Sequence, residues 1–283
     1  LNPRLIYGSF TAYGEDGAEA AKTGFDSTAY WARTGLMDMV RADAETTPSR
    51  SMPGMGDYPS GTALYAAIVS ALYRREKTGQ GGLVKSSLLQ NGLWANGCAV
   101  QVRLFGTPVP MRPRREDAPN ALANHYRSGD GRWFIMALFN EQRQLRSFLG
   151  AIGREDLTDD PRFATPAARK ANARDLVRIL DDVFATRTMA EWRAILDAVG
   201  VTFGVVGSVD EAHDDPQMRA CGAVVPFEDG EAMTISTPFH IDGIEKVAPR
   251  RAPGVGQHSA ELLAEAGYSA SDLDHLRGLG VVA

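Results

Sequence analysis

Asp57 lies in a turn that is rich in glycine and runs directly into an apolar segment. Glycines stand at positions 54, 56 and 61, and glycine lets the main chain take tight turns and lets a ligand approach it closely. Such a turn can present a carboxylate to a substrate. An aspartate in an ordinary loop or at a helix cap shows the same pattern, so the turn alone leaves both interpretations open.

The segment after this turn is predicted to be a helix over residues 61–77. Either Ser60 or Thr62 is a suitable helix cap, and Gly79 to Gly82 form a stop signal. Apolar residues follow at helical spacing, at positions 63, 64, 67, 68, 71 and 72. Asp57 is therefore expected just ahead of a helix amino terminus, where free amides and the helix dipole stabilise a carboxylate or a forming oxyanion.

The composition excludes several classes of protein. The 283 residues include 44% hydrophobic and 23% charged residues, which is typical of a globular chain with a sizeable core. A net charge of −5 gives no basic surface for nucleic acid, and no apolar run is long enough to cross a membrane. Cys98 and Cys221 are too few for a disulfide framework, so we expect two buried thiols and a cytoplasmic location.

No metal site is predicted. The histidines show no spacing that would place two of them on one helix face, and none has a cysteine partner. The acidic pairs at 159–160 and 214–215 precede prolines, a setting typical of solvated helix boundaries. The histidines are His125, His213, His240, His258 and His275.

Three segments around Asp57 carry a family resemblance. Residues 56–61 read Gly-Asp-Tyr-Pro-Ser-Gly, residues 71–81 read Ala-Leu-Tyr-Arg-Arg-Glu-Lys-Thr-Gly-Gln-Gly, and residues 84–89 read Val-Lys-Ser-Ser-Leu-Leu. In this order they resemble the class III CoA-transferase family, which includes formyl-CoA transferase, carnitine CoA-transferase and the α-methylacyl-CoA racemases. The family usually has an acid where Lys85 stands. The resemblance implies that Asp57 is the catalytic nucleophile.

The resemblance also implies the fold, an α/β architecture with a Rossmann-like large domain and a smaller inserted α+β domain. Asn-Pro-Arg-Leu-Ile-Tyr at residues 2–7 begins a segment that matches a family strand. Family members precede it with an amino-terminal segment of about one Rossmann-type half, and we expect the large domain here to be incomplete without it. Family members form interlocked homodimers, so a homodimer is expected.

Domain limits follow from a change in composition. Residues 106–119 are rich in proline and arginine, which predicts an extended linker. We therefore expect a large-domain portion at 1–105, a small domain at 120–205 that begins with a hairpin around Gly129-Asp130-Gly131, and a return to the large domain at 206–283. Helices are expected at 90–103 and 168–185, and the resemblance implies a further helix at 209–218. The linker arginines could bind CoA phosphates, but a solvated linker face is the favoured interpretation.

The resemblance further identifies Phe25 and Asp26. Racemases of the family have a proton-transferring histidine where Phe25 stands, and a phenyl ring cannot take a proton. Phe25 is interpreted as an apolar wall of the acyl pocket, and Asp26 as a residue that orients the substrate region or caps a helix. Racemases also place an acid after the hairpin, where this chain has Asn140 followed by Glu141.

The predicted function is transfer of CoA from an acyl-CoA to a carboxylic acid, with CoA as a substrate and no metal. Asp57 would form an aspartyl anhydride and then an aspartyl-CoA thioester. Gly56, Tyr58 and Gly61 are predicted to contact the substrate, with backbone amides of this turn as oxyanion donors. Two alternatives are an acyl-CoA racemase or isomerase on the same fold, and a non-catalytic CoA-binding fragment. The pocket residues do not identify the acyl groups.

Overall fold

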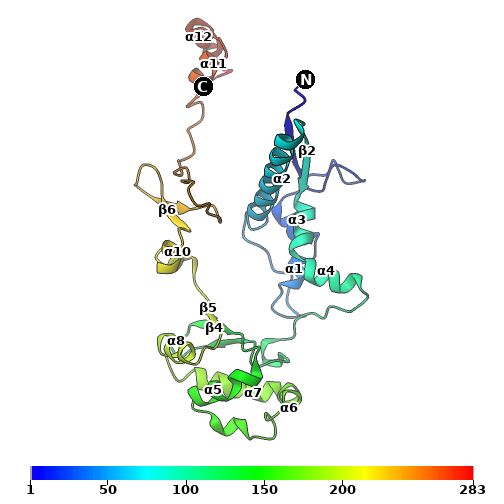
Figure 1. The fold of residues 1–283 in the computed structure, drawn as a ribbon, viewed down its shortest axis with the longest axis vertical. Helices are drawn as coiled ribbons and strands as arrows, with labels where there is room; N and C mark the ends of the chain where they lie inside the picture. The colour runs from blue at the N-terminus through cyan, green and yellow to red at the C-terminus, as the bar shows by residue number, and fades with distance from the viewer. Residues whose placement is uncertain (1, 283) are drawn as a thin grey trace. The chain divides into compact units, whose positions relative to one another are not determined.

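A parallel strand pair joined by a long helix forms the first part of the chain (Figure 1). The computed structural model describes residues 2–282, and the chain divides into two units, residues 1–205 and 206–283. Strands β1 (Ile6–Thr11) and β2 (Gly82–Ser87) pair in parallel from Ile6 opposite Gly82 to Thr11 opposite Ser87. Helix α2 (Asp57–Thr78) lies between them in sequence and packs against both, as parallel strands require a crossover connection.

Helix α2 begins four residues earlier than predicted. Gly56 is its N-cap, and Asp57 is its first residue. The expectation that Ser60 or Thr62 would cap the helix was wrong, because Pro59 lies in the first turn, where a missing N–H costs nothing. The helix ends at Gly79, whose φ of 72° only glycine adopts readily.

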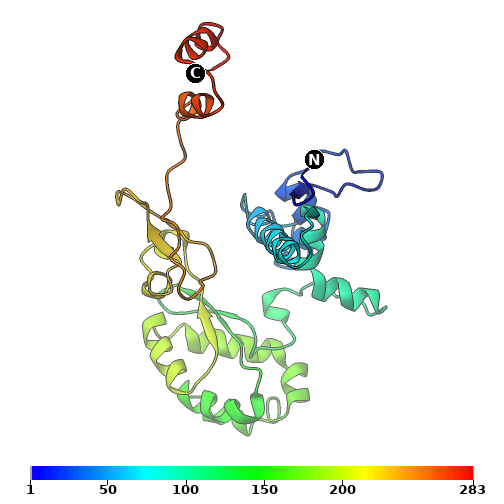
Figure 2. The same ribbon diagram turned by 45° about the horizontal axis from the view of Figure 1, so that its top comes forward.

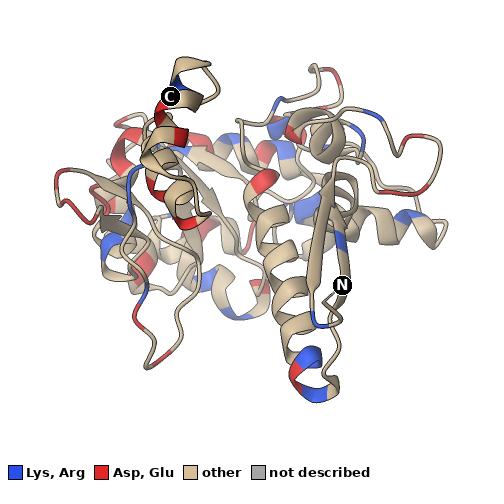
Figure 3. Cartoon of the chain, turned by 90° about the horizontal axis from the view of Figure 1, so that it is seen from above, with Lys and Arg blue, Asp and Glu red and all other residues tan. Residues whose placement is uncertain are grey.

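The charged residues of α2 gather at its carboxyl end, as Figure 3 shows. Arg74, Arg75, Glu76 and Lys77 follow one another there, so most of the charge is positive and complements the helix dipole. Between residues 57 and 73 the only charged side chain is Asp57. Asp57 is therefore the only charged residue of α2 near the positive end of its dipole.

Two further helices follow β2, where a single helix at 90–103 was predicted. Ser87 ends the strand and caps α3 (Leu88–Ala95), since its Oγ accepts from the Gln90 amide at 3.2 Å. Asn96 separates α3 from α4 (Gly97–Leu104) and donates from its side chain to the Thr34 carbonyl at 2.9 Å. This side-chain bond ties the break between the two helices to the 34–35 turn.

A π-helical turn, η1 (Asp26–Ala32), packs against α3, and a short helix α1 (Leu36–Met39) follows it. The contact is close: a β-carbon on Gly92 would lie 2.3 Å from the Tyr30 carbonyl oxygen. Buried Ala29, Tyr30 and Leu88 form the small core here. Turns of this wide helical type are rare and are frequently found at functional sites.

The hairpin predicted around Gly129–Gly131 is confirmed. Strands β3 (His125–Arg127), β4 (Trp133–Met136) and β5 (Phe203–Val205) form an antiparallel sheet in the order β3-β4-β5, with helices beside it (Figure 2). The expected helix at 168–185 is divided in two at Asn172. The helices and turns are η2 (Arg115–Asp117), α5 (Glu141–Ala151), η3 (Glu155–Thr158), α6 (Pro166–Ala171), α7 (Ala173–Phe184) and α8 (Met189–Ala198).

Aromatic residues from this sheet and its helices form the largest core of the described chain. Phe184 contacts Phe134 and Trp192 edge to face, with ring centroids 4.9 and 5.1 Å apart. The buried polar tips are satisfied: the Tyr126 hydroxyl donates to the Ala121 carbonyl at 2.6 Å, and the Trp192 indole donates to the Phe184 carbonyl at 2.9 Å. Burial strongly raises the pKa of Tyr126.

The unit at 206–283 contains a hairpin of β6 (Val224–Pro226) and β7 (Met233–Ile235). A helix predicted from 209 to 218 is split, because Asp215 caps a new helix that starts at Pro216. The helices are α9 (Val209–Ala212), α10 (Pro216–Ala220), α11 (Ser259–Glu265) and α12 (Ala270–Gly278).

The expectation of two buried cysteines was wrong. Cys98 lies on α4, a helix with no buried residue, and Cys221 is the C-cap of α10, so both thiols are exposed. No helix within residues 2–282 has the length and apolarity needed to span a membrane. Over the same residues, no three histidine, cysteine or acidic side chains gather as metal ligands. The predicted domain limits stay predictions.

Candidate active site

Asp57 lies on the wall of a cavity of about 680 Å³. Two chain segments, 24–27 and 50–54, form most of this wall, and Leu88 at the start of α3 completes it. The Asp57 side chain is exposed and has no hydrogen-bond or ion-pair partner among residues 2–282. It is therefore accessible to a ligand, at the positive end of the α2 dipole.

The Asp26 side chain binds the backbone of Gly56, the residue before Asp57. Its Oδ1 accepts a hydrogen bond from the Gly56 amide at 3.2 Å, across 30 residues of sequence. Asp26 is only 8% exposed, and its Oδ2 is buried without a hydrogen-bond partner in the described chain. The carboxylate thus binds the turn of α2 and does not cap its own helix.

Glycine is required at position 56 by this close approach. A β-carbon there would lie 2.5 Å from Asp26 Oδ1 and 2.5 Å from Tyr30 Cγ. The φ of Gly56 is −96°, which any residue can adopt, so the constraint is steric. Burial, and then the charge of Asp26, raise the pKa of the Tyr30 hydroxyl.

The backbone amides of the turn are mostly engaged. The Tyr58 amide donates to the Gly54 carbonyl at 3.1 Å, the Ser60 amide donates to the Gly56 carbonyl at 3.2 Å, and Pro59 has no N–H. The amide of Asp57 itself has no acceptor among residues 2–282. This amide is therefore free to bind a ligand, and a role as oxyanion donor remains a prediction.

Of the predicted substrate-binding residues, Phe25 and Asp26 line the cavity with Asp57. Gly56 is not part of the cavity wall, and its amide donates to Asp26. Tyr58, which is 70% exposed, and Gly61, which is the fifth residue of α2, are not part of the cavity wall. Substrate contacts by these five residues remain predictions.

Among the cavity residues that were not predicted from the sequence, Arg50 is the one that carries a charge. Arg50 lines the same space as Asp57, Phe25 and Met52. It is the only basic residue between Thr46 and Asp57, which is the signal that could have identified it. Its loop is fixed on the preceding side, because the Ser49 amide donates to the Met37 carbonyl at 3.1 Å.

Two of the three linker arginines, Arg114 and Arg115, pair with acids of this chain. Arg115 donates to both carboxylate oxygens of Asp181, at 3.0 and 2.7 Å, and to the His125 carbonyl at 3.0 Å. Arg114 forms an ion pair with Glu45. These pairs favour the structural interpretation of the linker arginines over phosphate binding.

Glu141 is likewise engaged within the small domain. Its carboxylate accepts from Arg169, which is only 8% exposed and also donates to the Phe163 carbonyl at 2.6 Å. Asn140 precedes α5 as its N-cap residue. The acid that follows the hairpin therefore anchors α6 to α5.

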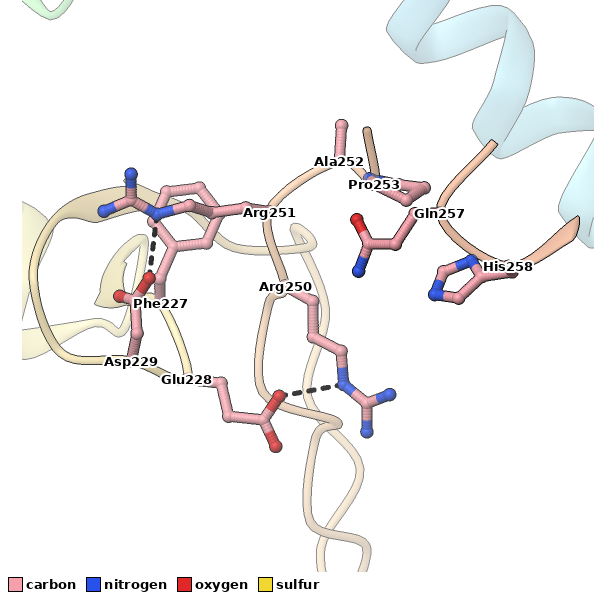
Figure 4. A pocket seen from close by; sticks show the side chains of 9 residues that line it. All are labelled: Phe227, Glu228, Asp229, Arg250, Arg251, Ala252, Pro253, Gln257 and His258. Atoms are coloured by element: carbon pink, nitrogen blue, oxygen red, sulfur yellow. Dashed lines mark hydrogen bonds and ion pairs between the residues drawn. The ribbon is translucent and has the colours of Figure 1, made fainter. Parts of the chain in front are cut away.

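A second cavity, of about 640 Å³, lies within residues 227–258 (Figure 4). Arg250 and Arg251 line it, and Figure 4 shows their pairs with Glu228 at 2.9 Å and Asp229 at 2.8 Å. The adjacent arginines could have marked this cavity in the sequence. Because each guanidinium already has a carboxylate partner, this site offers little net positive charge to an anion.

Known proteins resemble this chain over nearly its full length. It is 31% identical over 285 residues to (R)-2-hydroxy-4-methylpentanoate CoA-transferase of Clostridioides difficile, covering 99% of this chain and 70% of that protein. It is 26% identical to cinnamoyl-CoA:phenyllactate CoA-transferase of Clostridium sporogenes, covering 97% of this chain and 68% of that protein.

A solved structure also resembles the fold of this chain. The crystal structure of a CAIB/BAIF family protein from Brucella suis superposes with a TM-score of 0.80 and 26% identity, over 93% of this chain and 68% of that one. The predicted α/β class is confirmed. The sequence pattern of CoA-transferase family III matches residues 1–259. The chain therefore belongs to the class III CoA-transferases.

Proposed function

We propose that this protein transfers CoA from an acyl-CoA to a free carboxylic acid through covalent intermediates on Asp57. The observation that carries the proposal is the position of Asp57, an unpaired carboxylate at the amino end of α2 on a cavity that Phe25, Met52 and Leu88 also line. Exchange of CoA between two acids conserves the thioester, so a carboxylate nucleophile suffices for it.

The steps follow from the chemistry of the thioester. Asp57 attacks the donor carbonyl, the carbon–sulfur bond breaks, and a mixed anhydride and CoA thiolate form. The thiolate attacks the Asp57 carbonyl and releases the donor acid, which leaves an aspartyl thioester. The acceptor carboxylate attacks this thioester to give a second anhydride, and the thiolate then takes the acceptor acyl group and frees Asp57. The Asp57 amide, which has no acceptor among residues 2–282, would donate to an oxyanion that forms beside its own side chain.

Phe25 favours the transferase over the racemase alternative. The side chain is 67% exposed and lines the cavity, and it can neither give nor take a proton. An epimerisation that used Asp57 as one base would lack its second base at this position. The names of two relatives, which include 2-hydroxy acids, make such acids the first acceptors to test.

We also propose that the protein is a homodimer, as the family resemblance implies. Large apolar side chains of α3 and α4 are exposed, with Trp94 at 88%, Leu104 at 75% and Phe105 at 81%, and a second copy would cover them. Light scattering of the purified protein at several concentrations tests this proposal. We retain the cytoplasm as the predicted location, on the two free thiols Cys98 and Cys221.

The decisive experiment traps the covalent intermediate. The full-length protein is incubated with cinnamoyl-CoA or a 2-hydroxyacyl-CoA and then with hydroxylamine, and the peptides are analysed by mass spectrometry. We expect a hydroxamate on Asp57, its loss in Asp57→Asn, and its retention in Asp159→Asn, a control at an exposed acid of the small domain. A hydroxamate on another residue of the unmodified protein would contradict the proposal.

A further inference from the structure

Arg50 is the only cationic side chain among the described residues that line the Asp57 cavity. It is exposed, and the structure shows no ion pair or hydrogen bond of its guanidinium within residues 2–282. Six other arginines of the chain are engaged by its carboxylates or carbonyls. They are Arg41, Arg114, Arg115, Arg169, Arg250 and Arg251.

The loop around Arg50 is fixed at both sides. Before it, the Ser49 amide donates to the Met37 carbonyl at 3.1 Å, and Arg41 holds the loop through the Thr46 carbonyl at 2.9 Å. After it, the Met55 amide donates to the Met52 carbonyl at 3.3 Å, and Gly54 turns the chain with a φ of 85°. The backbone therefore holds position 50 at the cavity while its side chain keeps a free donor group.

The negative charges of the cavity would repel an anionic acceptor unless a cationic donor offset them. Two carboxylates, Asp26 and Asp57, line it, and an acceptor acid brings a third negative charge to the same place. Even after Asp57 has become a neutral thioester, the buried carboxylate of Asp26 still opposes an anion. A guanidinium offsets this repulsion and can hold a carboxylate through two parallel hydrogen bonds.

We propose that Arg50 binds the carboxylate of the acceptor acid and is a specificity-determining residue of the reaction. The inference rests on the proposed function of Asp57. The phosphates of CoA are separated from its sulfur by the whole pantetheine arm, whereas Arg50 shares one cavity with the residue that attacks the thioester. A carboxylate near the reacting carbon is therefore the anion that Arg50 meets.

The test compares a charged with an uncharged acceptor. Arg50→Gln and Arg50→Lys are measured in the full-length protein with 2-hydroxy acids as acceptors and, separately, with hydroxylamine, which is neutral at pH 7.5 or above. We expect Arg50→Gln to raise the KM for the acid by about 10- to 100-fold, with Arg50→Lys in between. The KM for the acyl-CoA and the rate of Asp57 hydroxamate formation should stay within about twofold of the unmodified protein.

Arg103→Gln is the matched control, because Arg103 is an exposed arginine on α4 outside the cavity and has no ion pair in the described chain. Its kinetics should match those of the unmodified protein. An unchanged KM for the acid in Arg50→Gln overturns the inference, as does a rise in the KM for acyl-CoA or an equal loss with hydroxylamine. Absence of any Asp57 hydroxamate in the unmodified protein instead overturns the proposed function.

Discussion

The contact between Asp26 and Gly56 joins two residues that lie 30 positions apart in the sequence. It places the main chain of the turn against η1 with no room for a side chain, because a β-carbon at position 56 would lie 2.5 Å from two atoms of Asp26 and Tyr30. The position of Asp57 thus depends on a buried carboxylate that belongs to a different element.

Gly56→Ala tests this dependence. We expect the added methyl to push the turn away from η1 and to break the bond to Asp26, which lowers kcat by about tenfold or more and destabilises the fold by about 1–3 kcal/mol. Steady-state kinetics and thermal unfolding measure the two effects. Gly61→Ala is the stability control: it meets no atom within 4 Å and should stabilise α2 by about 0.5–1 kcal/mol. Equal unfolding midpoints for the two variants would contradict the steric argument.

Asp57, Phe25 and Asp26 were candidates from the sequence because they fall within short motifs whose order is specific, and all three line one cavity. The sequence was not enough to find Arg50 or the Asp26–Gly56 bond. Arg50 carries no motif, and its importance arises only when the 50–54 segment folds beside the 24–27 segment. Contacts of this kind depend on tertiary structure, which residue spacing does not encode.

At the scale of elements, hydrophobic patterns predicted the helices and strands well but misplaced their ends. The helix expected at 61–77 extends from Asp57 to Thr78, since Pro59 fits within its first turn. The helix expected at 90–103 divides at Asn96, whose side chain makes a tertiary hydrogen bond. The break at Asn96 involves a partner that lies 62 residues away in sequence, so a local pattern could not locate it.

Lys85 illustrates an element contact that the sequence left open. On β2 it pairs with Glu15, in the loop after β1, and Glu15 also accepts from Ser9 of β1. The hydrogen bond from Lys85, and then the one from Ser9, hold the pKa of the Glu15 carboxyl below its ordinary value of 4.5. The hydrogen bond to Glu15 raises the pKa of Lys85 above 10.5.

The pH dependence of stability follows from these directions. Because folding lowers the pKa of Glu15, its contribution is present above pH 4.5 and is lost as the pH falls through the folded value. Because folding raises the pKa of Lys85, its contribution is lost only at alkaline pH. We expect Lys85→Gln to lower the unfolding midpoint at pH 7 and to match the unmodified protein below the folded pKa of Glu15, where this carboxyl is neutral. Lys170→Gln, at a lysine without an ion pair in the described residues, should show no such convergence.

At the scale of the whole molecule, the predicted linker is attached at two places. Arg114 pairs with Glu45, in the loop before the cavity segment, and Arg115 pairs with Asp181 on α7. Arg115 also lies over the rings of Tyr126 and Trp133, at 6.0 and 5.9 Å from their centroids. A segment whose composition suggested solvated chain is therefore fixed by charged and aromatic partners.

Asp181→Asn should weaken this attachment. Loss of the charge on a partly exposed, two-point ion pair is expected to cost about 1 kcal/mol after solvent screening, measured by denaturant unfolding. Trypsin should also cut after Arg114 or Arg115 faster than in the unmodified protein. Asp182→Asn is the matched control, since Asp182 is the next residue of α7 and is exposed without a partner in the described chain. Equal behaviour of both variants would show that the pair does not hold the linker.

Two segments with different roles form most of the wall of the Asp57 cavity. Residues 24–27 include the carboxylate that supports the turn of α2, whereas the side chains of residues 50–53 make no hydrogen bond to that turn. Side chains at residues 50–53 can therefore be substituted without displacing Asp57. After duplication of such a gene, substitutions at residues 50–53 could change which acid is bound. The chemistry at Asp57 would stay the same.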